Sequence, residues 1–176
     1  DDCRQWPDAA GVDTTLAKLV KDKFTASFFC STDSENNQIA PFYTGAKANA
    51  AELSFRTAGP ADFVTISPND PRAMTQYAEE CRALGIEFMF DPGQQCARMS
   101  GPELADGVAG ASIVICNDYE FELLKEKTGL DLNAILDMAA MVVVTRGEGG
   151  SSVIARDGEA HVPAGPPTRI VDPTGV

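Results

Sequence analysis

Asn117 and Glu120 follow directly on a mostly hydrophobic run from Ala111 to Cys116. The run predicts a buried strand and the residues after it predict a helix, so both side chains are expected on the first helical turn, beyond the carboxyl end of the strand. An amide and a carboxylate there suit a hydrated Mg²⁺ ion and its phosphates, because Mg²⁺ keeps several waters and takes few protein ligands directly. The same spacing also fits a helix-capping box with Asn117 as the N-cap, and spacing alone favours this structural role.

Two further stretches combine a polar side chain with glycine. In the first, a hydrophobic run ends at Thr145 and a glycine-rich stretch, residues 146–150, follows. Glycine accepts positive φ angles and lets phosphate oxygens approach backbone N–H groups. In the second, Asp172, Thr174 and Gly175 offer a carboxylate, a hydroxyl and a flexible backbone where a helix could begin, which is a suitable anion site. A plain turn remains open for either stretch on its own.

Strands and helices alternate along the chain after residue 46. The patterns predict helices over 46–55, 71–84, 102–108, 119–128 and 132–139. They predict strands over 63–67, 86–90, 111–116 and 141–144, followed by a hairpin of 152–155 and 159–162 with an Asp-Gly turn. Such alternation implies an α/β domain whose parallel strands share one carboxyl edge. Asp91 also follows a strand, so four strand ends bring acidic, amide or glycine groups toward that edge, and their coincidence predicts a site there.

The first 45 residues differ from the rest, and we assign 1–45 to a small β segment and 46–176 to the α/β core. Strand-like runs occur at 16–20, 25–30 and 38–43, and turn-forming residues separate the last two. Phe28, Cys30 and Phe42 alternate with polar neighbours, so one apolar face is expected, covered by the core and substrate or by another subunit. An aromatic ring such as Phe42 can stack on a nucleobase, whereas a simple sugar offers it less area.

The composition is that of an acidic globular protein. With 44% hydrophobic and 23% charged residues and a formal net charge of −12, the chain should repel nucleic acid and anionic membrane surfaces, so neither is an expected partner. No hydrophobic run approaches the ~20 residues that span a bilayer, and the first residues lack the features of a signal peptide. The 5 cysteines form no C-x-x-C pair, and the single histidine, His161, builds no zinc or nucleophile arrangement. A cytoplasmic protein with reduced thiols is expected.

Taken together and in this order, the motifs resemble those of the ribokinase-like (PfkB) carbohydrate and nucleoside kinases. Residues 117–120 match the family's N-x-x-E motif, residues 144–150 resemble its T-x-G-x-x-G stretch, and residues 171–176 resemble the start of its D-T-x-G-A-G-D signature. Residues 24–46 look like the family's β-lid. Together with residues 91–94 and 117–122, this lid is most similar to the adenosine kinase-like branch. The resemblance implies a ribokinase-like, Rossmann-type α/β sheet with helices on both faces and a small β-sheet lid.

The resemblance implies an ATP-dependent kinase that uses Mg²⁺ and transfers the γ-phosphoryl group to a primary hydroxyl of a nucleoside or a sugar. Asn117 and Glu120 would organise Mg²⁺ through water. Thr145, Gly147 and Gly150, together with Asn117, would contact the nucleotide.

The start of the anion-hole motif is the part of the catalytic site that the resemblance places in this chain. Its residues are Asp172, Thr174 and Gly175. In the lid, Asn37 and Phe42 would contact the small-molecule substrate. The family's catalytic aspartate and an N-terminal substrate segment would lie outside residues 1–176, so the chain is expected to be a piece of a longer protein.

Alternatives stay open at this point. One is a sugar kinase of the same family, acting on ribose or a fructose derivative; another is a catalytically inactive nucleotide-binding module. A dinucleotide oxidoreductase is disfavoured, because no G-x-G-x-x-G follows a first strand. The resemblance also allows a homodimer that forms through the lid.

Overall fold

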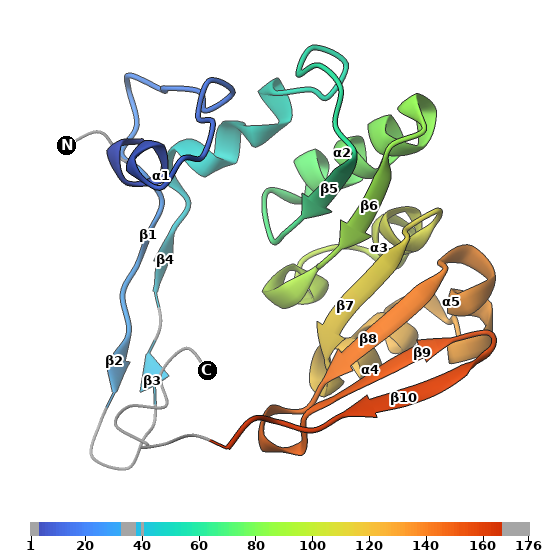
Figure 1. Cartoon of the computed structure of the whole chain (residues 1–176). Coiled ribbons are helices and arrows are strands. Elements are labelled where there is room, and N and C mark those ends of the chain that lie inside the picture. Colours follow the sequence, from blue (N-terminus) through green and yellow to red (C-terminus); the bar gives the residue numbers. More distant parts are fainter. Residues whose placement is uncertain (1–3, 33–37, 40, 167–176) are drawn as a thin grey trace.

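A six-stranded sheet forms the body of the molecule (Figure 1). The structure is a computed structural model and describes residues 4–32, 38–39 and 41–166. Its parallel strands are β5 (Phe63–Ile66), β6 (Glu87–Phe90), β7 (Ile113–Asn117) and β8 (Met141–Thr145). They lie side by side in chain order, and an antiparallel hairpin of β9 (Ser151–Ala155) and β10 (Gly158–Val162) extends the sheet beyond β8. The predicted α/β fold is confirmed.

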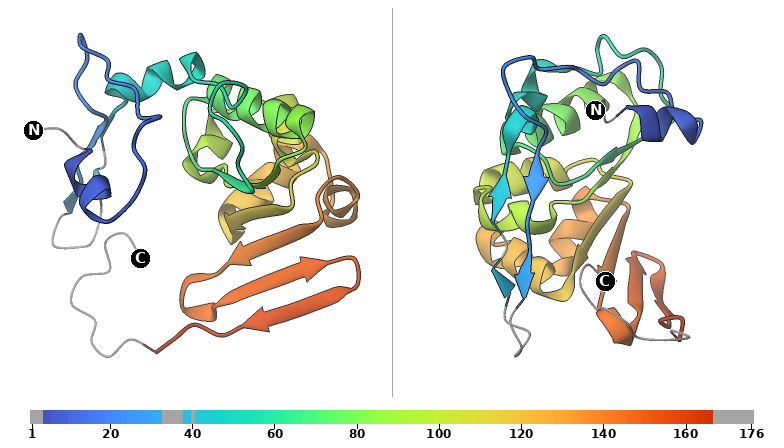
Figure 2. Two further views of the ribbon diagram at one scale, coloured as in Figure 1. Left: turned by 45° about the horizontal axis from the view of Figure 1, so that its top comes forward. Right: turned by 90° about the vertical axis from the view of Figure 1, so that its left-hand side faces the viewer.

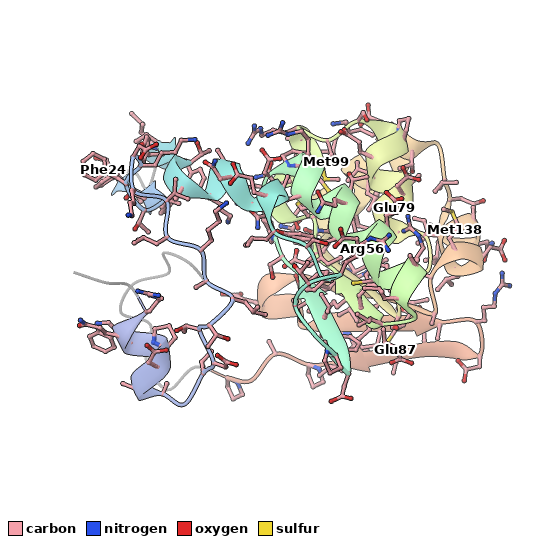
Figure 3. The ribbon with its side chains drawn as sticks, turned by 90° about the horizontal axis from the view of Figure 1, so that it is seen from above. Phe24, Arg56, Glu79, Glu87, Met99 and Met138 are labelled. Carbon is pink, nitrogen blue, oxygen red and sulfur yellow. The ribbon has the colours of Figure 1, made fainter. Side chains whose placement is uncertain are left out.

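The helices that follow the parallel strands cover one face of this sheet (Figures 1 and 3). They are α2 (Pro71–Leu84), α3 (Gly101–Val108), α4 (Asp118–Thr128) and α5 (Leu132–Met138). α2 matches its predicted range because its end signals are unambiguous: the carboxylate of Asp70 accepts the N–H of Arg72, and Gly85 stops the helix with a φ of +68°. The sequence predicted helices on both faces, and these four helices supply one of them.

The hydrophobic core lies between this helical layer and the sheet. Side chains alternate in direction along a strand, so every second strand residue faces the helices. The buried hydrophobic residues of the strands are Val64, Ile66, Phe88, Phe90, Val114, Cys116, Val142 and Val144. They pack against fully buried helix side chains such as Met74, Leu104 and Leu124. Because every parallel strand is anchored in the same core, their carboxyl ends are fixed relative to one another.

The N-terminal part contains a narrow antiparallel ribbon that stands beside the sheet (Figures 1 and 2). In this ribbon β1 (Ser27–Phe28) pairs with β4 (Phe42–Tyr43), and β2 (Ser31–Thr32) pairs with β3 (Gln38–Ile39). A 3₁₀ helix, η1 (Gly45–Glu52), leads from β4 to the body and packs on α2. It occupies most of the range 46–55 in which the sequence predicted a helix. The predicted small β element is present, and the domain boundary at residue 46 stays a prediction.

The chain before the ribbon differs from the prediction. A short helix, α1 (Gln5–Ala9), was not predicted, and residues 16–20 do not form the expected strand. A hydrophobic run becomes a strand only where a neighbour supplies hydrogen bonds, and none of the strands in the described part pairs with it. Leu16 and Leu19 accordingly remain 58% and 69% exposed.

Several smaller expectations concern cysteine, histidine and membrane segments. Cys81, Cys96 and Cys116 are buried free thiols, as predicted, while Cys3 lies outside the described residues. His161 is exposed on β10. Among the described helices, none has the length and apolar character needed to cross a membrane.

Candidate active site

The carboxyl ends of β6, β7 and β8 meet at one edge of the sheet. β7 and β8 end level with each other, because Asn117 pairs with Thr145. Asp91 comes directly after β6, and its N–H donates to the carbonyl oxygen of Ile66 at the end of β5 (2.9 Å). The structure therefore brings polar groups predicted from three separate strand ends to one edge.

Asn117 and Glu120 form the capping box that spacing alone favoured. The side-chain oxygen of Asn117 accepts the N–H of Glu120 (2.7 Å), and one carboxylate oxygen of Glu120 accepts the N–H of Asn117 (3.0 Å). Two of the N–H groups that a helix start leaves without partners are thus satisfied. Within the described part of the chain, no donor contacts the second oxygen of Glu120, so the cap leaves it available to a ligand.

Asp91 is a further carboxylate at this edge, and its surroundings raise its pKa. Burial raises the pKa of Asp91 above its ordinary value of 3.8, the charge of Glu120 raises it further, and a hydrogen bond from the N–H of Gly93 partly offsets both. The two carboxylates are therefore close enough to repel each other. A cation between them would relieve this repulsion.

The nearby thiols are poor candidates for nucleophiles. Burial, together with the charge of Glu120, raises the pKa of Cys96 to about 12, and burial also raises the pKa of Cys116. A thiol must lose its proton to attack an electrophile, so both cysteines are inert at neutral pH. The edge therefore offers oxygen groups as ligands, and neither Cys96 nor Cys116 can act there as a nucleophile.

The oxygen groups at this edge fit a magnesium ion that keeps most of its water. The described residues contain no group of three or more His, Cys, Asp or Glu side chains that could enclose a metal ion. Two carboxylates, Asp91 and Glu120, and the amide of Asn117 remain. This is a suitable set for Mg²⁺, which needs few direct protein ligands.

The glycines after β8 have different surroundings. Gly147 begins a single 3₁₀ turn, η3 (Gly147–Gly149), and Gly150 follows it. Gly147 has a φ of +53° and open space where a Cβ would lie. Gly150 has a φ of +76°, and a Cβ there would overlap the carbonyl oxygen of Val162. Gly147 is thus accessible to a ligand. At position 150 a glycine is required, because the chain at the end of β10 lies too close to leave room for a side chain.

The remaining predicted site residues are Asn37, Asp172, Thr174 and Gly175, and all four lie outside the described residues.

A small cavity of about 90 Å³ lies between the ribbon and the body. One side is formed by Phe42 of the ribbon, by Thr44 and by Lys47 and Ala48 of η1; the body side is formed by Asn69, Asp70, Gln95 and Arg98. Gln95 belongs to a short 3₁₀ helix, η2 (Gly93–Ala97), that follows Asp91. The cavity therefore connects the predicted lid residue Phe42 with the loops that leave β5 and β6.

Sequence reasoning missed most of the body side of this cavity. Asn69 and Asp70 were not predicted as site residues, although they follow the parallel strand β5 just as Asp91 follows β6. Arg98 and Lys47 carry no local signal, because only the folded chain brings them to this cavity. The Lys47 ammonium lies 5.9 Å from the centre of the Phe42 ring.

The ribbon has apolar side chains on both faces, so the prediction of a single apolar face is wrong. The pairing register places Phe28 opposite Phe42, and both therefore lie on the face that Phe42 presents to the cavity. Phe29, Ile39 and Tyr43 belong to the other face, because adjacent strand residues alternate. The exposed fractions of Phe29 and Ile39 are 65% and 74%. Alternation with polar neighbours was broken at Phe28-Phe29 and Phe42-Tyr43, where two large rings are adjacent.

With this geometry in place, comparisons with known proteins identify relatives. The pfkB family of carbohydrate kinases matches residues 1–176. A nucleoside kinase from Methanothermobacter thermautotrophicus is 33% identical over 175 residues, which are 98% of this chain and 56% of that protein. The structure of a Burkholderia thailandensis nucleoside kinase in complex with inosine is 31% identical, with a TM-score of 0.92 over 98% of this chain and 58% of that one.

The chain therefore belongs to the pfkB family of carbohydrate kinases. A nucleoside kinase from Methanocaldococcus jannaschii, described as an archaeal member of the ribokinase family, supports the fold with a TM-score of 0.87 at 24% identity over 98% of this chain and 57% of that one. The predicted ribokinase-like fold is thus confirmed. This chain spans a little over half the length of these relatives, as the shares of 56% and 58% state.

Proposed function

We propose that the protein acts as an ATP-dependent nucleoside kinase. The observation that carries the proposal is the arrangement of Asn117, Glu120 and Asp91 at the strand edge of a fold that has an aromatic ribbon residue, Phe42, on a neighbouring cavity. Phosphoryl transfer depends on positioning and on neutralising negative charge, and it needs no covalent catalyst. An edge with oxygen ligands and inert thiols agrees with that requirement.

The phosphate side of the reaction is assigned to the sheet edge. Asn117 and Glu120 would hold Mg²⁺ through water, and the proximity of Asp91 adds a second negative charge that favours a cation there. When bound, Mg²⁺ would neutralise charge on the transferred phosphoryl group. Thr145 and Gly147 would contact the nucleotide, and the open space at Gly147 supports this role. Asp172, Thr174 and Gly175 are proposed to begin the anion hole.

The acceptor is proposed to be a nucleoside. The Burkholderia relative was solved both with inosine and as a complex named ADP-inosine, and its similarity to this chain supports a nucleoside over a simple sugar. Phe42 offers a ring on which a base could stack, and Asn37 is proposed as a second substrate contact from the ribbon. The ribbon would then close over the substrate and exclude water, which otherwise competes as phosphoryl acceptor.

The second face of the ribbon suggests a proposal about assembly. Exposed apolar side chains such as Phe29 and Ile39 are the kind of surface that another subunit covers, so a homodimer through the ribbon is proposed. Light scattering of the wild type and of Ile39→Glu tests it. A dimer that becomes a monomer on substitution supports the proposal, and a wild-type monomer contradicts it.

A substrate panel tests the catalytic proposal. Release of ADP from ATP would be measured for the full-length protein with nucleosides, ribose and fructose derivatives, each with and without Mg²⁺. We expect turnover with nucleosides only when Mg²⁺ is present. If only sugars are phosphorylated, the result would instead support the carbohydrate kinase activity that gives the family its description. If none of the acceptors is phosphorylated, the result would contradict the proposal.

A further inference from the structure

The body-side wall of the cavity includes the short helix η2, which has little support of its own. Gln95 lies in η2, is 5% exposed and lines the cavity. Arg98 follows η2, lines the same cavity and donates to the side-chain oxygen of Gln95 (3.4 Å). A 3₁₀ helix of 5 residues leaves most of its final carbonyl groups without a partner inside the helix. Another part of the molecule must hold this wall in place.

Lys127, in the last turn of α4, supplies that support. Its ammonium group donates to the carbonyl oxygens of Cys96 (2.9 Å), Ala97 (3.0 Å) and Met99. A lysine ammonium has three protons to donate, so its hydrogen-bonding capacity is filled by this one segment. Cys96 and Met99 are buried, and Figure 3 shows Met99 among the helices. Carbonyl groups at such buried positions cannot accept hydrogen bonds from water if the lysine is removed.

The two ends of α4 hold the same segment. Near the start of the helix, the thiol of Cys96 donates to the carbonyl oxygen of Glu120 (3.8 Å). At its end, Gly101 approaches so closely that a Cβ there would overlap the carbonyl oxygen of Lys127. α4 therefore carries Glu120 at the sheet edge and clamps the segment 96–101 with its other end.

We propose that Lys127 is a positioning residue for the nucleoside. It does not line the cavity itself, but it holds η2 so that Gln95 and Arg98 keep their places in the cavity wall. The kinetic consequence rests on the proposed nucleoside kinase function. The structural consequence, that the segment 93–99 loosens without Lys127, does not.

Lys127→Met in the full-length protein is the test, because methionine keeps an unbranched side chain that packs like the lysine stem and removes all three donors. We expect the KM for the nucleoside to rise about tenfold, with kcat and the KM for ATP within about twofold of wild type. The reason is that misplaced binding groups weaken the binding of the ligand that they contact. Lys127→Arg should recover most of the loss, because a guanidinium group also donates several hydrogen bonds. Lys125→Met is the matched control, because Lys125 lies in the same helix and contacts Glu122 and the Phe121 ring instead.

Amide hydrogen exchange separates this inference from the proposed function. The N–H groups of Arg98 and Met99 both donate to the carbonyl oxygen of Gln95 (2.9 and 2.8 Å), so loosening of the segment should make them exchange at least about tenfold faster in Lys127→Met, with β8 unchanged. If wild type phosphorylates no nucleoside, the proposed function fails and the exchange result still decides the positioning role. Unchanged exchange, or an equal rise in KM for both substrates, overturns the inference. If Lys127→Met does not fold, the same measurements are made on Lys127→Gln.

Discussion

The sheet edge and the ribbon are held in place by different interactions, although the cavity beside Phe42 joins the ribbon to the loops that leave β5 and β6. At the edge, each strand is anchored in a buried core, α4 is capped by Asn117 and Glu120, and Lys127 fixes η2. In the ribbon, strands of 2 residues pair with each other, and both faces carry exposed rings such as Phe28 at 61% and Phe29 at 65%. Isolated two-stranded ribbons are marginally stable in water.

This difference would separate the two tasks of the proposed kinase site. Groups that hold phosphate and metal must keep a fixed geometry, which a core-anchored edge provides. A segment that closes over a substrate must be able to move, and few buried contacts permit that. We therefore expect changes at the edge to act on kcat or stability and changes in the ribbon to act on substrate binding.

The largest effect is expected for Glu120→Gln. Glutamine can fill the same position in a capping box, so the helix start should persist while one negative charge near the proposed Mg²⁺ is lost. We expect kcat to fall up to about 100-fold and the Mg²⁺ concentration needed for half-maximal rate to rise. Steady-state kinetics across a Mg²⁺ series measure both.

The chain provides a matched control in α3. There Ser100 and Glu103 form the same type of capping box, with the N–H of Ser100 donating to Glu103 (2.7 Å), away from the strand edge. Glu103→Gln should leave the Mg²⁺ dependence unchanged. Equal kinetic behaviour of the two variants, with only lower melting temperatures, would return Glu120 to a capping role.

Gly150→Ala tests whether a glycine at the edge is structural. Its φ of +76° and its contact with the backbone of Val162 both oppose a side chain, so the free energy of unfolding should fall by about 2 kcal/mol or more. Gly147→Ala, with a φ of +53° and open space, should cost only about 1 kcal/mol. Urea denaturation measures both values. A Gly147 variant that is the less stable of the two would contradict the assignment of the tighter position to Gly150.

Phe42→Ala tests the ribbon side of the comparison. Loss of a stacking ring should raise the KM for a nucleoside about tenfold and leave the KM for ATP unchanged, which corresponds to about 1.4 kcal/mol of binding. Phe29→Ala is the control on the opposite face and should leave both KM values unchanged. Equal losses for both ligands with Phe42→Ala, or a change from dimer to monomer without a kinetic effect, would assign this face to packing or assembly.

The sequence predicted the edge better than the ribbon, and the reason is physical. A strand such as β7 and its capping box are encoded within about a dozen consecutive residues, so hydrophobic pattern and spacing were enough to find Asn117 and Glu120. The ribbon strands have 2 residues each in the structure, too few for a period to be read, and residues 16–20 have the composition of a strand without a partner.

Long-range contacts were beyond sequence reasoning for a different reason. Lys127 lies 28 residues from Met99 in the chain. It donates to backbone carbonyl groups, which every residue has, so no side chain in the sequence marks its partners. The steric need for Gly150 likewise comes from Val162, which the β9–β10 hairpin returns to it. The pattern identified the glycine, and only the fold gave its reason.

The smallest effect is expected from the titration of Asp91. Its pKa is raised above 3.8 in the folded protein by burial and by the charge of Glu120, so the folded state binds a proton more tightly than the unfolded chain does. The stabilising contribution of that proton is complete below pH 3.8 and is lost as the pH rises through the raised pKa. Asp91→Asn has no proton to lose, so its stability relative to wild type should increase over this window in Mg²⁺-free buffer.

Urea denaturation at a series of pH values measures this difference in stability. Added Mg²⁺ should reduce the difference at neutral pH, because a bound cation offsets the repulsion from Glu120. Parallel pH profiles for the two proteins would show that folding does not raise the pKa of Asp91, and would remove this support for Asp91 in the proposed cation site.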